Sequence, residues 1–404
     1  MQKKKIRFVL DTFPSLSETF LYTLLQNLSS QYELVICARK KGNSPHDLSF
    51  ISKVYYLPNE NHHSFLKLVT WIYCGLCIFL INPSKTVRFF KYLKYQYKND
   101  YKVVFNESFR IFPLMLIYKD LTYFSFGGLA AKYMEYIRFE GNCFFSLRGS
   151  DINIEPLLNE NYKSRLKEAI TLSTGVHCVC DEIKQDAQAL IGQKSEKIQT
   201  IYTSIASGYV FEITDRKQNK NIKIVSVGRL DWKKGLEHGL MAINYLKEKG
   251  YNFEWTIIGD GNYKTPIQWA IRDLNLENHV FLLGSKSQSE IKELLLKSNI
   301  YFHPSVSEGI SNSVIEAMSI GLPVVVSDVG GMKEAIPTDE YGYLVPARDW
   351  REMAVALENL MNNPDKRIQI GETASKFVKS KFSSTQQIEG FLKLFSLVTK
   401  QDNS

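Results

Sequence analysis

The sequence predicts an α/β protein made of two Rossmann-like, doubly wound domains. Short apolar runs typical of buried strands alternate with longer helical stretches along most of the 404 residues. A polar stretch over residues 211–221 interrupts this alternation and is typical of a linker. We therefore expect a domain over 1–210, a second over 211–380 and a final segment over 381–404. Two such domains in tandem would face each other across a ligand cleft at the carboxyl ends of both sheets.

The first half opens with a buried strand over 6–10, followed by a helix that Ser17, Glu18 and Thr19 begin and that runs towards Leu28. Apolar runs predict the further strands, which are 34–38, 103–105, 143–147 and 176–179. Helical stretches between them indicate parallel strands joined by crossover helices.

The second half shows a more regular pattern of five strands and four intervening helices. The strands are expected over 222–227, 253–258, 280–283, 300–303 and 323–327, and the helices near 235–249, 264–274, 288–298 and 312–319. Ser287 and Glu290 fit a capping box. A last helix near 385–399 carries an apolar stripe.

Charge is distributed unevenly between the halves. Residues 1–210 hold 26 Lys and Arg against 18 Asp and Glu, whereas residues 211–404 hold 24 of each. The first half is therefore expected to meet an anionic partner. The six cysteines are too sparse for a disulfide framework, and the N-terminus lacks the apolar run of a signal peptide. A cytoplasmic location follows as an expectation.

The strongest candidate site begins where the strand over 222–227 ends. Gly228, Arg229 and Lys234 lie in a loop that leads into a helix. Backbone amides at such a helix start, together with the two cations, could bind a diphosphate. A solvated basic loop is the structural alternative.

A second candidate site surrounds two glutamates. Glu308 lies in the loop after a strand, and Glu316 lies about one turn into the next helix. Carboxylates in this arrangement can accept hydrogen bonds from polyol hydroxyls. The amides of Gly309, Ile310, Ser311 and Asn312 are expected at the anion-binding helix start. The alternative is a helix capped by Asn312 with Glu316 in an ordinary surface pair.

Gly259 and Gly261 form a third glycine-containing turn. Lys264 stands where a dinucleotide fingerprint requires a third glycine. A dehydrogenase is therefore disfavoured.

Taken together, residues 222 to about 346 resemble glycosyltransferase family 4, the retaining enzymes of the GT-B architecture. The resemblance rests on the 227–235 loop, the Glu308-x7-Glu316 pattern, the segment 321–325 and the segment 328–334. It implies that Arg229 and Lys234 hold the donor diphosphate and that Glu316 binds the ribose. It further implies that Glu308 contacts the donor sugar, that Gly259 lies in the donor site, and that the C-terminal helix crosses back onto the first domain.

The first half resembles transferases that build colanic acid, exopolysaccharide and O-antigen. Residues 13–20, which include Ser17 and Glu18, match their N-terminal signature. Residues 124–128, which end in Gly127 and Gly128, match a His-x-His-Phe-Gly segment without its histidines. These residues are expected on the acceptor side. Arg148 stands where the family often has a donor-contacting histidine, and Asp151 follows it in the same stretch. The resemblance implies that both residues belong to the donor site.

No Asp-x-Asp motif occurs, which favours a metal-independent enzyme whose cations stabilise the leaving group. No side chain is expected to act as a nucleophile. Front-face attack by the acceptor therefore fits the retention of anomeric configuration that the resemblance implies.

Residues 65–98 suggest a membrane contact. An uncharged apolar run over 68–81, too short to span a bilayer, precedes a basic aromatic stretch over 85–98. On a helix, Phe89, Phe90, Leu93 and Tyr97 share one face opposite the cations, as in a helix lying among anionic headgroups. A core helix followed by a solvated basic one is the alternative.

The sequence thus predicts a hexosyltransferase that uses a nucleotide sugar, by family habit a UDP-sugar. The expected acceptor is a polyprenyl-diphosphate-linked oligosaccharide at the inner face of the cell membrane. Nucleic acid is not an expected partner, because no base-reading module occurs. The alternatives are a GT-B sugar-nucleotide epimerase and a catalytically inactive scaffold at the membrane.

Overall fold

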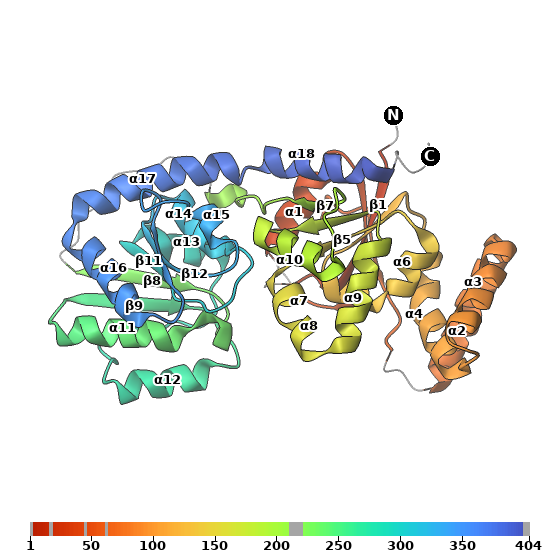
Figure 1. The fold of residues 1–404 in the computed structure, drawn as a ribbon, viewed down its shortest axis with the longest axis horizontal. Coiled ribbons are helices and arrows are strands. Elements are labelled where there is room, and N and C mark those ends of the chain that lie inside the picture. Colours follow the sequence, from red (N-terminus) through yellow and green to blue (C-terminus); the bar gives the residue numbers. More distant parts are fainter. Residues whose placement is uncertain (1–2, 16–18, 44–46, 61–63, 210–220, 399–404) are drawn as a thin grey trace. The chain divides into compact units, whose positions relative to one another are not determined.

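The computed structural model describes residues 3–15, 19–43, 47–60, 64–209 and 221–398. The chain divides into two compact units (Figure 1). The first comprises residues 1–178, 184–200 and 388–404, and the second comprises 179–183 and 201–387. The main changes of unit follow residues 200 and 387, whereas the sequence predicts domain limits after residues 210 and 380. The predicted linker over 211–221 lies outside the described residues except for Asn221.

The first unit contains a parallel seven-stranded sheet in the order β3-β2-β1-β4-β5-β6-β7. Its strands are β1 (Lys5–Phe13), β2 (Glu33–Lys41), β3 (Lys53–Tyr56), β4 (Leu121–Phe124), β5 (Cys143–Leu147), β6 (Gly175–Cys178) and β7 (Ile198–Thr200). Its helices are α1 (Thr19–Ser29), α2 (Ser64–Ile81), α3 (Pro83–Gln96), α4 (Tyr101–Met115), α5 (Gly127–Lys132), α6 (Met134–Glu140), α7 (Gly149–Asn153), α8 (Glu155–Leu158), α9 (Glu160–Leu172) and α10 (Asp181–Ile191). Four predicted strands coincide with β1, β2, β5 and β6.

The strand predicted over 103–105 is wrong, because these residues belong to the helix α4. Asp100 caps this helix by accepting hydrogen bonds from the amides of Lys102 and Val103, so the chain is already helical where the apolar run begins. The strand at this point of the topology is β4, which pairs with β1 and β5.

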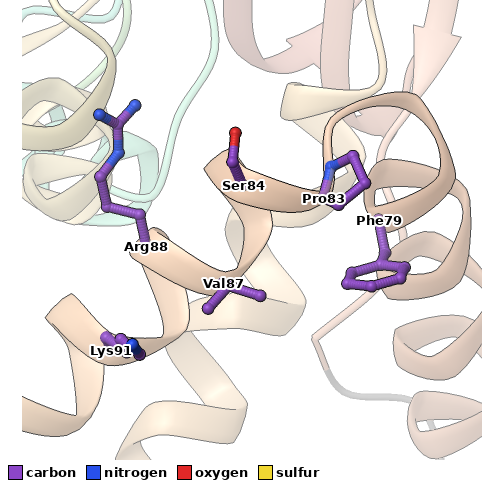
Figure 2. Close-up of a pocket in the computed structure, with 6 residues that line it drawn as sticks. All are labelled: Phe79, Pro83, Ser84, Val87, Arg88 and Lys91. Carbon is purple, nitrogen blue, oxygen red and sulfur yellow. The ribbon is translucent and has the colours of Figure 1, made fainter.

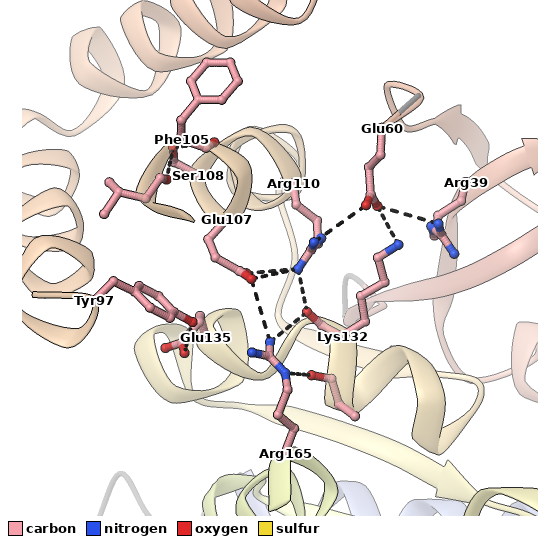
Figure 3. Close-up of polar contacts among 12 residues, drawn as sticks. Arg39, Glu60, Tyr97, Phe105, Glu107, Ser108, Arg110, Lys132, Glu135 and Arg165 are labelled. Atoms are coloured by element: carbon pink, nitrogen blue, oxygen red, sulfur yellow. Dashed lines mark hydrogen bonds and ion pairs between the residues drawn. The ribbon is translucent and has the colours of Figure 1, made fainter. Parts of the chain in front are cut away.

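The helices α2, α3 and α4 form an insertion between β3 and β4, at one edge of the first unit (Figure 1). Charged side chains fasten its base to the sheet (Figure 3). Glu60 accepts from Lys132 at 2.7 Å and pairs with Arg39 and Arg110 at 3.6 Å each. Because these pairs form a connected network between separate elements, they orient α4 better than isolated surface pairs would.

The second unit contains a parallel six-stranded sheet in the order β10-β9-β8-β11-β12-β13. Its strands are β8 (Ile222–Val227), β9 (Phe253–Ile258), β10 (Val280–Leu282), β11 (Ile300–His303), β12 (Val324–Asp328) and β13 (Tyr343–Pro346). Its helices are α11 (Leu236–Glu248), α12 (Lys264–Asp273), α13 (Gln288–Leu296), α14 (Asn312–Ser319), α15 (Met332–Ala335), α16 (Trp350–Asn362) and α17 (Pro364–Lys381). All five predicted strands and all four predicted helices are present, and the capping box of Ser287 and Glu290 is formed.

Two cores sandwich this sheet. One side buries residues of α11, α12 and α16, including Leu240 and Leu357, against Trp255 and Phe302. The other buries residues of α14 and α17, including Met318 and Ala374. Figure 1 shows α11 and α12 on one side of the strands and α14 and α17 on the other. The loops after the strands are therefore held at one rigid edge.

The last helix, α18 (Ser384–Phe395), belongs to the first unit from residue 388 onwards. Phe391 and Phe395 are buried and pack edge-on against Tyr123, and Phe395 also packs against Phe144. Within the described ranges, no helix combines the length and apolar character needed to cross a bilayer.

Candidate functional site

Three loops of the second unit meet at the carboxyl end of its sheet, and glycines allow their close approach. Gly259, after β9, has φ +141° and lies against the carbonyl of Gly228, after β8; a Cβ at Gly259 would come within 1.9 Å of that oxygen. A Cβ at Gly235 would likewise come within 2.3 Å of the carbonyl oxygen of Pro304, after β11. Any larger residue at these positions would force the loops apart. Gly259 therefore has a structural role independent of any ligand.

Lys234 and Glu308 are in direct contact at this edge. Lys234 Nζ donates to Glu308 Oε1 at 2.6 Å, and the stem of Lys234 lies against Gly228. The same carboxylate oxygen accepts from Ser305 Oγ at 2.9 Å and lies 2.9 Å from Nε2 of His303. The β11 loop and the β8 loop thus share one charged centre, which the sequence separates by 74 residues.

Electrostatic interactions keep the carboxyl group of Glu308 ionised. Burial alone would raise the pKa of Glu308, but the charge of Lys234 and the hydrogen bonds from His303 and Lys234 outweigh burial and hold that pKa well below its ordinary value. Burial and the neighbouring Lys234 lower the pKa of His303, which favours the neutral form of its ring. A neutral His303 can donate from Nε2 to the Glu308 carboxylate.

Glu316 lies in a different environment, on the first turns of α14. Burial raises its pKa to about 7. Burial chiefly raises the pKa values of Tyr209 and Tyr301, and the charge of Glu316 raises both further. No ion pair to Glu316 is found in the described part of the chain, which contradicts the surface-pair alternative. A partly buried carboxyl without a cation is suited to accept hydroxyl hydrogen bonds.

The start of α14 differs from the capping alternative given above. Ser311, not Asn312, is the N-cap residue, and its side chain bonds Ser313 rather than a backbone amide. The carbonyl of Gly309 accepts from the amide of Gly331 at 2.5 Å, which fixes the loop. Over the residues that the structure covers, the amides of Gly309, Ile310, Ser311 and Asn312 carry no hydrogen bond. Such unpaired amides at a helix start are donors for an anion.

Arg229 follows Gly228 directly, so its backbone belongs to the same loop cluster. Its side chain is exposed, and no contact joins it to Lys234 or Glu308 among the described residues. The structure therefore brings Lys234 and Glu308 together, and it leaves the side chain of Arg229 exposed to solvent.

The predicted residues of the first unit form a separate cluster at the carboxyl ends of β4 and β5. The Asp151 carboxylate accepts from the amides of Arg148 at 3.0 Å and Gly128 at 3.4 Å. Burial raises its pKa to about 6, against the effect of these hydrogen bonds. Gly127 packs against Leu147 and Asp151, where a side chain would clash.

The guanidinium of Arg148 stacks on an aromatic ring. Its central carbon lies 3.7 Å from the ring centre of Phe20 and 5.7 Å from that of Phe126. Stacking of this kind orients the guanidinium and keeps its charge. Ser17 and Glu18, which were predicted on the acceptor side, lie outside the described residues.

Sequence reasoning did not single out His303, Ser305 or Tyr301 as site residues. His303 ends β11 and Ser305 opens the next loop, so both reach Glu308 because strand ends and their loops share one edge. Tyr301 is fully buried and bonds Ser313 on α14 at 2.8 Å. A histidine at the last position of a buried strand was the available signal.

Known proteins are similar to this chain in parts of the sequence and in fold. The model for the family "Glycosyl transferases group 1" matches residues 211–377. The amylovoran biosynthesis glycosyltransferase AmsK of Erwinia amylovora is 31% identical over 271 residues, which cover 65% of this chain and 66% of that protein. The putative colanic acid biosynthesis glycosyltransferase WcaL of Escherichia coli is 36% identical over 142 residues, 34% of this chain and 35% of that protein. The matches thus span about two thirds of the first relative and about one third of the second.

Solved structures agree on the fold. TarM, at 16% identity, covers 97% of this chain and 98% of its own with a TM-score of 0.71. HepE of Anabaena, solved with UDP and glucose, covers 97% of this chain and 100% of its own at 17% identity and a TM-score of 0.70. Two parallel-sheet α/β units of this kind define the GT-B class. Residues 211–377 of this chain form a glycosyl transferases group 1 domain.

Proposed function

We propose that the chain is a retaining glycosyltransferase of exopolysaccharide or capsule synthesis. It transfers a hexose from a nucleotide-diphosphate sugar, which we take to be a UDP-sugar, to a lipid-linked oligosaccharide. The observation that carries this proposal is the contact between Lys234 and Glu308 beside the unpaired amides of residues 309–312. The glycosyl transferases group 1 domain and the polysaccharide relatives AmsK and WcaL support it.

The second unit supplies the groups that a diphosphate needs. Lys234 uses one of its three N–H donors on Glu308, so the others remain for phosphate oxygens. The exposed Arg229 and the first amides of α14 add further donors to the same region of the unit. Glu316 is assigned to the ribose hydroxyls, and Glu308 to the donor sugar.

This arrangement stabilises the departing nucleoside diphosphate. As the bond between the anomeric carbon and the phosphate oxygen breaks, negative charge develops on that oxygen. Lys234 and Arg229 neutralise the charge, which is the work that a metal does in other transferases. The acceptor oxygen attacks the same face of the sugar and passes its proton to the leaving phosphate oxygen. We therefore propose that no metal is required.

In the first unit we assign Gly127 and Gly128 to the acceptor side, and Arg148 and Asp151 beside them to contacts with the donor. A polyprenyl-diphosphate-linked oligosaccharide is the acceptor that fits a basic first half and the polysaccharide relatives. The enzyme would then work at the anionic inner face of the cell membrane, through residues 65–98.

A transfer assay tests this proposal. The purified protein is given a panel of labelled nucleotide sugars, with and without a lipid extract from cells that make a surface polysaccharide. We expect label to enter the lipid fraction from one donor, with retention at the anomeric carbon and in the presence of EDTA. A donor isomerised without acceptor would favour the epimerase instead, and neither binding nor turnover of any donor would favour an inactive scaffold.

A further inference from the structure

An apolar stripe covers the exposed face of α2 in the first unit. Phe65 is 74% exposed, Leu76 57% and Leu80 79%. Val69, Ile72 and Phe79 lie between them at helical spacing, so that one face of the helix is continuously apolar. Lys67 is the one charged residue of this helix, and it belongs to the opposite side. An exposed apolar face of this length on a protein surface marks an interaction site.

The other face of α2 is held by the protein. Cys74 and Ile78 are buried, and Trp71 donates from its indole nitrogen to Ser108 Oγ on α4 at 2.7 Å. Gly75 allows Phe112 to approach the helix, at 3.2 Å from the position of a Cβ. Because this face is fixed on α4, α2 presents only its stripe to a partner.

The basic helix α3 does not lie as its pattern suggested. Phe89 and Leu93 are buried against the protein, so the apolar face of α3 points inward rather than into lipid. Lys85 is also turned to the protein, where it pairs with Glu140 at 2.7 Å. The exposed face of α3 instead carries Arg88, Lys91 and Lys94.

The cations of α3 and the apolar stripe of α2 meet in a hollow of about 560 Å³ between the two helices. Figure 2 shows Phe79 of α2 and Val87 of α3 lining it, with Arg88 and Lys91 along the α3 side. A surface that joins apolar groups to adjacent cations is complementary to the acyl chains and phosphates of an anionic lipid layer. A protein partner would not require this order of charge beside an apolar stripe.

We propose that α2 is the membrane-inserted element of this protein. It lies in the plane of an anionic phospholipid layer with its exposed stripe among the acyl chains, while Arg88 and Lys91 of α3 contact lipid phosphates. The inference rests on the proposed function only in that a lipid-linked acceptor gives membrane contact a purpose. It assigns the insertion to α2 and the headgroup contact to α3.

Sedimentation with vesicles tests the apolar part. The full-length protein is mixed with vesicles of phosphatidylcholine alone or of equal parts phosphatidylcholine and phosphatidylglycerol. Ile72→Ser/Leu76→Ser should weaken partition into the anionic vesicles about 100-fold, because two half-exposed aliphatic side chains no longer enter the layer. Val355→Ser/Ile368→Ser, at similarly exposed positions of α16 and α17, is the matched control and should bind like the wild type.

A second pair of variants tests the cations. Arg88→Gln/Lys91→Gln should weaken binding to anionic vesicles about 30-fold at low salt and leave binding to neutral vesicles unchanged. Lys297→Gln/Lys376→Gln removes two exposed cations of the second unit and should have no effect. Equal thermal unfolding of all variants verifies that folding is intact.

Wild-type binding by the Ile72→Ser/Leu76→Ser variant, or no vesicle binding by the wild type, overturns the inference. So does a lipid-free dimer that this variant dissociates, because a second copy would then cover the stripe. UDP titration of the same variants separates this outcome from the proposed function. Lost vesicle binding with unchanged UDP affinity supports the inference, whereas a wild type without UDP affinity refutes only the proposed function.

Discussion

Glu308 and Glu316 belong to one short segment, yet their surroundings move their pKa values in opposite directions. Lys234 and His303 hold Glu308 ionised, whereas burial without a cation raises the pKa of Glu316 to about 7. Two carboxyl groups with such different environments can serve different tasks at one pH. Glu308 provides a permanent charge next to Lys234, and Glu316 gains its charge near neutrality.

Replacing Lys234 tests the charged centre. Lys234→Ala should lower the turnover of sugar transfer on the order of 100-fold or more, because the leaving diphosphate loses its stabilising cation. Lys233→Ala is the control and should retain most of the turnover. The ammonium group of Lys233 lies 6.0 Å from the ring centre of Trp232. Steady-state kinetics measure both, and near-normal turnover of Lys234→Ala would contradict the role assigned to it.

Replacing Glu316 tests whether its carboxyl group titrates near neutral pH. Its folded-state pKa lies above the unfolded one, so its contribution to stability is complete below about pH 4.5 and is lost as pH rises through about 7. Glu316→Gln removes this loss, so the variant should gain thermal stability relative to the wild type between pH 5 and pH 8.

The same titration should appear in ligand binding. Because the carboxylate is the better hydroxyl acceptor, UDP affinity of the wild type should increase across pH 6 to 8, whereas that of Glu316→Gln should stay flat. Parallel pH dependence in the two proteins, measured by thermal unfolding and by titration with UDP, would be the contrary result.

At the scale of elements, the sequence was sufficient wherever strands and helices alternate in short regular units. The second sheet follows its apolar runs closely, and only β13 was missed because Tyr343–Pro346 is short and ends in proline. In the first unit, β3, β4 and β7 escaped prediction. These strands have three or four residues, too few for a periodicity to stand out.

Where several helices pack together, the sequence did not predict which face of a helix points inward. The residues of the apolar face of α3 were correctly grouped, but this face packs against α4 and α6 rather than against lipid. Contacts between residues far apart in the sequence decide which face points inward. One example is the hydrogen bond that the Tyr97 hydroxyl donates to Glu135 at 2.7 Å. The same holds for the site, since the proximity of His303 and Lys234 to Glu308 depends on the sheet.

Removing Glu135 tests how α3 is fastened. This buried carboxyl accepts from the hydroxyls of both Tyr92 and Tyr97. Glu135→Ala leaves two half-buried hydroxyls without that partner, and should lower the free energy of unfolding by about 2 kcal/mol or more. Hydrogen exchange should accelerate over residues 83–96 and stay unchanged in α13, and unchanged exchange in both segments would argue against this anchoring.

At the scale of the whole molecule, the two units have separate sheets and separate cores, and α18 contributes aromatic side chains to the core of the first. The resemblance implied a C-terminal helix that packs on the first domain, and Phe391 and Phe395 lie in that unit. The domain limits and the roles of the site residues stay predictions.

Truncating one of these rings should affect the first unit selectively. Phe391→Ala should destabilise it by about 3–5 kcal/mol, as expected for a fully buried phenylalanine, whereas Leu392→Ala at a partly exposed position should cost far less. Scanning calorimetry should show the transition of the first unit shifted to lower temperature. A shift confined to the UDP-stabilised transition of the second unit would be inconsistent with this packing.

The central claim is that the second unit grips a nucleoside diphosphate through Lys234 and its neighbours. Titration calorimetry of UDP against the wild type and against Lys234→Ala tests it most directly. We expect the wild type to bind and Lys234→Ala to bind about 10- to 100-fold more weakly, because it loses a hydrogen bond between charged groups. Equal UDP affinity in both proteins, or none in the wild type, would contradict the account.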